Sequence, residues 1–103
     1  MLDTQEITEA YRKLQTARYA YAVALEISTR LDAQLEAKKA RATLDGTIQG
    51  KNETERKAHM ALVFASDLGD LDEKQAETRA ARLAYELAEI EVKRIETLVR
   101  WLK

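Results

Sequence analysis

Hydrophobic residues recur at alternating steps of three and four near the start of the chain, the spacing of a coiled-coil seam. This pattern predicts one helix over residues 4–43. At its start, Asp3 and Glu6 have the spacing of a capping box, and Leu2 and Ile7 that of a hydrophobic staple. The predicted stripe consists of Ile7, Ala10, Leu14, Ala17, Tyr21, Ala24, Ser28, Leu31, Leu35, Lys38 and Ala42.

A second apolar stripe predicts a helix over residues 53–102. Its steps lengthen between Leu71 and Ala80, and we expect a local irregularity at 69–70, beside Gly69. A fresh capping box from Asp70 to Glu73 would split this helix, but we favour one continuous helix. The stripe consists of Ala61, Phe64, Leu68, Leu71, Ala76, Ala80, Leu83, Leu87, Ile90, Ile95, Leu98 and Leu102.

Residues 44–52 separate the two patterns and hold two of the three glycines. Gly46 and Gly50 are predicted to take positive φ, which glycine adopts without a steric penalty. Asn52 is placed to cap the second helix, with Glu55 completing a capping box. We expect Ile48, between the glycines, to fold back and cover the end of the core.

The two stripes predict a register. An antiparallel pairing that places Ile7 against Ile90 also places Ala10 against Leu87, and its midpoint falls in the turn. The same register places Leu14 against Leu83, Ala17 against Ala80, Tyr21 against Ala76 and Ser28 against Gly69. We therefore predict an all-α fold, a long antiparallel two-helix hairpin of coiled-coil type, as one domain over residues 1–103.

In this register, some apolar residues have no partner within the hairpin. Those beyond Arg94 have no partner on the first helix, and the middle of that helix is apolar on several faces, which is typical of a helix buried all round. We expect a homo-oligomer, with a dimer forming a multi-helix bundle favoured. A separate partner protein, or a fold-back at Gly69 into three helices, is the alternative. The candidate interface residues are Tyr19, Val23, Ile27, Ile95, Leu98, Val99, Trp101 and Leu102.

The composition excludes several kinds of catalytic and metal-binding site. Without cysteine there is no thiol nucleophile or thiolate metal site, and the net charge of −1 gives no overall attraction to nucleic acid or membranes. The Gly46–Asn52 segment lacks the spacing of a phosphate-binding loop. His59 has no second histidine with which to build a metal site, and the acidic run Asp67–Glu73 lacks calcium-loop order. We predict no catalytic residues, no metal, no cofactor, no membrane contact and a cytoplasmic protein.

One basic patch remains as a candidate anion or nucleic-acid site near the turn. It lies where the free amides of the second helix would also favour anions. Nearby carboxylates offset its charge, and the aromatic residues typical of single-strand binders are absent there. We do not favour nucleic-acid binding for this reason. The patch consists of Lys38, Lys39, Arg41, Lys51, Arg56 and Lys57.

The turn reads Leu44-x-Gly46-x-Ile48-x-Gly50-Lys51-Asn52-x-x-x-Arg56, followed by a helix rich in Ala, Glu, Leu and Arg. It resembles small helical-hairpin proteins of bacteriophage and prophage genomes, most without an assigned function. A weaker likeness is to Gam-type phage inhibitors of host nucleases. The resemblance implies a phage context and the host cell cytoplasm. We expect a non-enzymatic, oligomerising protein that binds a host or phage protein, with inhibition of a host defence or nuclease system as one form of that role. Nucleic-acid or nucleotide binding, and a structural role in assembly, are the alternatives.

Overall fold

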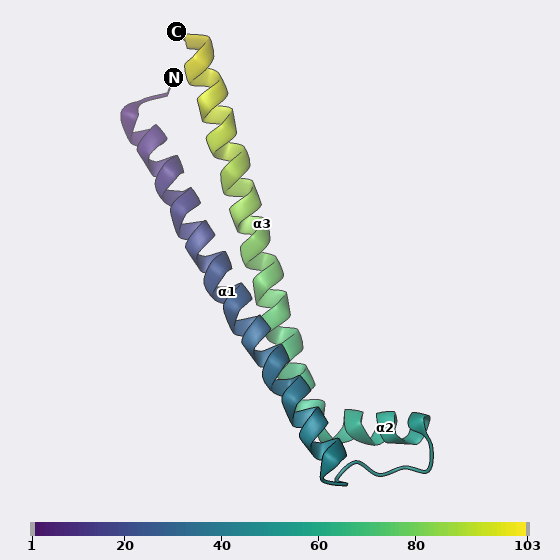
Figure 1. Cartoon of the computed structure of the whole chain (residues 1–103). Helices are drawn as coiled ribbons and strands as arrows, with labels where there is room; N and C mark the ends of the chain where they lie inside the picture. The colour runs from purple at the N-terminus through teal and green to yellow at the C-terminus, as the bar shows by residue number, and fades with distance from the viewer. Residues whose placement is uncertain (1, 103) are drawn as a thin grey trace. The chain divides into compact units, whose positions relative to one another are not determined.

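The computed structural model describes residues 2–102, and within them the chain forms three helices and no strand (Figure 1). They are α1 (Thr4–Leu44), α2 (Glu53–Val63) and α3 (Ala65–Leu102). The protein is an all-α helical hairpin. Its residues divide into two compact units, a terminal unit of residues 2–25 and 77–102 and a turn unit of residues 26–76. None of the described helices is both long and apolar enough to cross a membrane.

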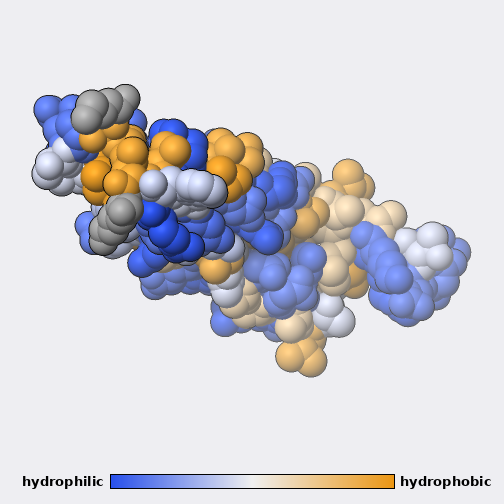
Figure 2. All heavy atoms as spheres, turned by 90° about the horizontal axis from the view of Figure 1, so that it is seen from above, coloured by the Kyte–Doolittle hydropathy of each residue, from blue (hydrophilic) through white to orange (hydrophobic). Residues whose placement is uncertain are grey.

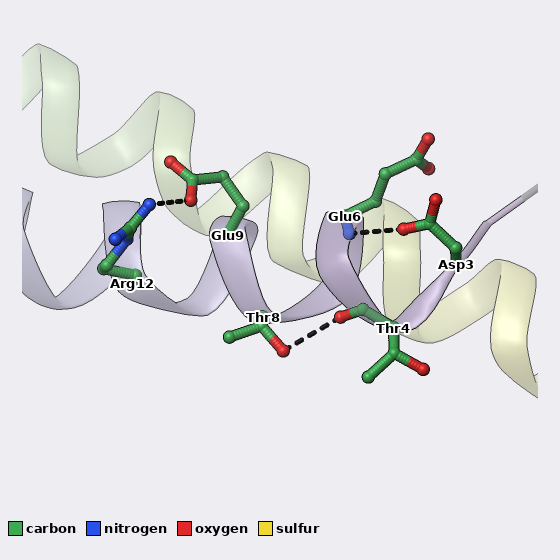
Figure 3. A network of polar contacts seen from close by, with 6 residues as sticks. All are labelled: Asp3, Thr4, Glu6, Thr8, Glu9 and Arg12. Atoms are coloured by element: carbon green, nitrogen blue, oxygen red, sulfur yellow. Dashed lines mark hydrogen bonds and ion pairs between the residues drawn. The ribbon is translucent and has the colours of Figure 1, made fainter.

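The start of α1 follows the predicted capping chemistry (Figure 3). The Asp3 Oδ1 atom accepts a hydrogen bond from the Glu6 amide at 2.7 Å, which satisfies one of the free donors of the first turn. An ion pair between Glu9 and Arg12 follows on the next turn. The helix therefore begins where the sequence places it, because a local side chain supplies the missing acceptor.

The end of α1 is a Schellman motif. Gly46 has a φ of 74°, the left-handed conformation predicted for it. The Thr47 amide donates to the Ala42 carbonyl at 3.0 Å, and the Gly46 amide donates to the Thr43 carbonyl at 3.3 Å. These two bonds satisfy carbonyls that the helix end would otherwise leave free.

Gly50 and Asn52 define the start of α2. Gly50 has a φ of 154°, and a Cβ atom there would lie 2.7 Å from the Arg56 backbone nitrogen. Asn52 Oδ1 accepts from the Glu55 amide at 2.9 Å, as predicted. The Glu55 carboxylate, however, accepts from the Lys51 amide at 2.7 Å, one residue before the expected donor. The loop thus reaches α2 with its backbone donors held by local side chains.

The core of the turn unit is formed by residues of α1, the loop, α2 and α3, together with Phe64. Ile48 is buried, as predicted for the residue that covers this core. The Gln49 amide donates to His59 Nδ1 at 2.9 Å, which fastens the loop to α2. The buried cluster consists of Leu35, Ala42, Ile48, Phe64 and Leu71, with Leu31, Met60 and Leu68 packed against it.

The predicted continuous helix over 53–102 is wrong, because the chain breaks at Phe64. Phe64 has φ −105° and ψ 20°, and its side chain is buried in the core of the turn unit. Gly69, where the irregularity was expected, lies inside α3, and a Cβ atom added there would meet open space. The break allows α2 to leave the direction of α3 while Phe64 remains in the core, so packing rather than a local glycine sets its position.

In the terminal unit, the first part of α1 and the last part of α3 run antiparallel (Figure 1). The predicted register there is wrong. Ala10 clusters with Val92 and Ile95 instead of meeting Leu87. Tyr21 stacks on Tyr85, with ring centroids 5.9 Å apart, instead of facing Ala76. Because the connection between α1 and α3 includes all of α2, the midpoint of the hairpin lies further along the chain than the predicted turn.

The stripe that α1 buries is the predicted one, except that Lys38 is exposed and Lys39 is partly covered. The α3 stripe is different. Its covered residues continue the alternating steps of three and four past Leu71 with no stutter, but four of them are small or polar. This internal seam of α3 consists of Leu71, Lys74, Thr78, Ala81, Tyr85, Ala88, Val92, Ile95 and Val99.

Candidate protein-binding surface

Three large aliphatic residues of α3 lie on the outside of the terminal unit. Leu83, Leu87 and Ile90 are 57%, 58% and 63% exposed. They recur at steps of four and three, so they lie along one side of the helix, and we call them the outer stripe. The sequence predicted these residues as core. The structure instead leaves them exposed to solvent.

The internal seam explains this exposure. Tyr85 stacks on Tyr21, and the Arg18 guanidinium lies 5.7 Å from the centre of the Tyr85 ring. The Thr78 hydroxyl donates to the Ala24 carbonyl at 3.0 Å. A helix that turns this side inward must turn its opposite side, which carries the outer stripe, away from α1.

Beside the outer stripe, a side groove runs between α1 and α3 within the terminal unit. Its volume is about 430 Å³. Alanines form most of its lining, Leu87 lines one wall, and Lys13 and Glu91 supply its charged residues. Small residues at a helix surface allow another helix to approach closely. The groove is lined by Ala10, Lys13, Ala17, Ala84, Leu87, Ala88 and Glu91.

The C-terminal part of α3 was predicted to have no partner on the first helix, and the structure differs. Ile95 is only 2% exposed, and Val99 packs on the same cluster, so both belong to the core of the terminal unit. The shifted register supplies them with partners on α1. Leu98, Trp101 and Leu102 remain exposed, and they line a groove of about 380 Å³. Figure 2 shows apolar surface beside charged surface at this end of the terminal unit.

The other predicted interface residues lie on α1 and are exposed. Tyr19 and Val23 belong to the terminal unit, and Ile27 to the turn unit. Tyr11, nearer the start of α1, is also exposed, and its hydroxyl donates to Glu96 Oε1 at 3.2 Å. Desolvation, then the charge of Glu96 and this hydrogen bond, raise the pKa of the Tyr11 phenol.

Charged residues flank the apolar surface of α3. Arg94 donates to the Glu91 carboxylate at 2.6 Å. This hydrogen bond lowers the pKa of the Glu91 carboxyl; desolvation opposes the shift, and the charges of Arg94 and Lys13 add to it. On the preceding turns, Arg82 donates to Glu86 at 3.0 Å. Of these charged residues, Lys13 and Glu91 line the side groove and give it one charge of each sign.

The predicted basic patch lies in the turn unit, and several of its cations already contact acceptors there. Lys38 pairs with Asp67, Lys39 with Glu36 and Lys57 with Glu53, at 3.3, 3.4 and 3.4 Å. Arg56 donates to the Gly50 carbonyl at 3.4 Å, while the Arg41 and Lys51 residues are exposed. Lys51 offers its amide to Glu55 at the start of α2. These contacts favour a patch of mixed charge over a concentrated anion site.

Among residues 2–102, no group of three or more His, Asp or Glu side chains is arranged to hold a metal ion.

No family model, curated protein or solved structure matches this chain. The exposed apolar surface of α3 and the adjoining side groove form the candidate binding surface. A second run of steps of three and four, from Ala80 to Ile90, was the signal in the sequence for a second seam.

Proposed function

We propose that this protein is a non-enzymatic interaction protein that self-associates through the outer side of α3. The observation that carries the proposal is the outer stripe of Leu83, Leu87 and Ile90, each more than half exposed. Isolated apolar residues are common on protein surfaces, whereas aligned apolar patches mark interaction sites. A regular helix seam is matched best by another helix.

The expected free energy supports association of moderate strength. Full burial of a large aliphatic side chain contributes about 1.5–3 kcal/mol, and these side chains are already partly covered. Two chains would bury six of them, for a total on the order of 5–10 kcal/mol. Association costs roughly 4–15 kcal/mol in lost freedom. The outer stripe therefore offsets much of that cost, and Leu98, Trp101 and Leu102 offer further apolar area.

The non-enzymatic part of the proposal rests on the chemistry of the chain. It has no cysteine and a single histidine, His59, whose Nδ1 atom accepts the Gln49 amide. The resemblance of the turn to phage hairpin proteins supports a host or phage protein as the target of the assembled protein, in the host cytoplasm. Inhibition of a host nuclease or defence system is the activity that we propose to test after assembly.

The test is the molar mass of the full chain by size exclusion with light scattering, at tens of micromolar. We expect an oligomer for the unaltered protein and a monomer for Leu83→Glu/Leu87→Glu. The matched control is Leu44→Glu/Leu62→Glu, which places charges on exposed leucines of the turn unit and should leave the mass unchanged. A monomeric unaltered protein would refute self-association. Equal dissociation of both variants would exclude the outer side of α3 as the interface.

A further inference from the structure

The side groove and the large side chain that forms its wall lie on the same surface. The groove is lined largely by alanine methyl groups, including those of Ala84 and Ala88. Leu87, which belongs to the outer stripe, lines its wall. A surface that carries both a large side chain and a place for one can pair with itself about a two-fold axis. This argues for a second copy of the same chain as the occupant.

The order of residues along α3 selects the direction of pairing. Pairing antiparallel about a point between Tyr85 and Glu86 sets Leu87 of each chain against Ala84 of the other. The same register sets Leu83 opposite the partner's Ala88. A parallel pairing in register would set Leu87 against Leu87 and leave the alanines facing each other across a gap. Only the antiparallel arrangement matches large residues with small ones.

The charges select the same direction. In the antiparallel register, Glu77 of each chain lies opposite Arg94 of the other, and the symmetry makes two such pairs. A parallel pairing would instead bring glutamate to glutamate and arginine to arginine, which is unfavourable. Arg94 already donates to Glu91 at 2.6 Å, and a guanidinium has donors for a second carboxylate.

We propose that two copies of this chain pair antiparallel through α3, with Leu87 of each copy entering the alanine-lined side groove of the other. This inference rests on the proposed function and adds to it the identity of the partner, the direction and the register. All of the residues that carry it belong to the terminal unit. The contact is isologous, so it closes at two chains instead of extending into a filament.

Cysteine cross-linking tests the register, because the chain has no cysteine of its own. The proposed pairing sets Ala80 opposite the partner's Glu91, both of which are exposed. We would mix equal amounts of full-length Ala80→Cys and Glu91→Cys and oxidise the mixture. We expect a reducible dimer of twice 11.7 kDa from the mixture and little from either variant alone. Two copies of the same position would lie roughly 16 Å apart along the helix, beyond the reach of a disulfide.

The matched control is Gln15→Cys mixed with Glu91→Cys. Gln15 is exposed on α1 and does not line the side groove, so this mixture should give no more dimer than the single variants. Light scattering on the same samples before oxidation reports whether association survives the substitutions. Leu87→Cys is avoided because it would remove the residue on which the pairing depends.

The outcomes are distinct. Cross-linking confined to the Ala80→Cys and Glu91→Cys mixture supports the antiparallel register. Efficient cross-linking of each single variant indicates a parallel pair and overturns the proposal. An oligomer by light scattering with no specific cross-link also overturns it, while self-association as such stands. A monomer for every sample, the unaltered chain included, refutes both the register and the proposed self-association.

Discussion

The turn unit and the terminal unit differ in how they cover their apolar side chains. In the turn unit, the loop and α2 add Ile48 and Met60 to the residues of α1 and α3, so the core is covered from several directions. The terminal unit has only two helices. Ten of its large apolar residues are exposed, against four in the turn unit, among the residues that the structure describes. Two helices alone therefore cover a seam but leave apolar outer sides, and those sides are where a partner can bind.

The largest expected effect tests the core of the turn unit. Phe64→Ala should destabilise the protein by about 3–5 kcal/mol, because it removes a buried aromatic side chain and leaves a cavity. Leu62→Ala, an exposed neighbour on α2, is the control and should change stability by less than about 0.5 kcal/mol. Urea unfolding followed by circular dichroism measures both. Equal effects of the two substitutions would show that Phe64 does not anchor this core.

The next effect compares the two sides of α3 within the terminal unit. Ile95→Ala removes one of the most deeply buried side chains and should cost about 2–5 kcal/mol. Leu87→Ala removes an exposed side chain and should leave the unfolding free energy of the monomer almost unchanged, while it weakens association. Unfolding at protein concentrations below the dissociation range separates the two quantities. A stable Ile95→Ala protein would contradict the observed seam.

The loop of the turn unit is tested by its glycines. Gly50→Ala should destabilise more than Gly46→Ala, for which we expect about 1–2 kcal/mol from left-handed backbone strain. At Gly50 a Cβ atom would also lie 2.7 Å from a backbone nitrogen, whereas at Gly46 it would meet open space. Thermal melts of both variants provide the comparison. Similar melting temperatures for the two would argue against the tight passage at Gly50.

A charge exchange tests the proposed contact between terminal units. Arg94→Glu should weaken dimerisation by roughly 0.2–1 kcal/mol for each of two exposed pairs, and adding Glu77→Arg should restore it. Because such pairs are screened, the weakening should shrink as salt rises. Sedimentation equilibrium at two salt concentrations measures the effect. Failure of the double variant to recover would exclude the Glu77–Arg94 pairing.

The smallest effect concerns the ion pair beside the groove. The hydrogen bond from Arg94 lowers the pKa of the Glu91 carboxyl, so Arg94→Gln should return it toward its ordinary value. Because the folded-state pKa is depressed, the pair stabilises the folded chain above the ordinary glutamate pKa, and this contribution is lost as pH falls through the lowered value. Carboxyl titration by NMR reads the change directly. An unchanged Glu91 titration in the variant would show that Arg94 is not its cause.

Several features were predictable because neighbouring residues decide them. The start of α1 depends on Asp3, its end on Gly46, and the start of α2 on Asn52, and each is a contact within a few residues. The inward stripe of α1 was equally predictable, because alternating steps of three and four place its residues along one side of the helix. Of the proposed binding surface, the sequence supplied the exposed residues Leu98, Trp101 and Leu102.

Tertiary structure alone decided the break at Phe64 and the side of α3 that is buried. No glycine or proline marks the break, which exists because it allows Phe64 to enter the core of the turn unit. On α3, the sequence prediction placed the side with the large leucines in the core, and this was wrong. The side that is buried carries the residues that fit against α1 between two close helices. The sequence alone determined the start and end of α1 and the start of α2, through contacts between neighbours. Register and the exposed stripe of α3 depended on how distant segments pack, which local pattern does not encode.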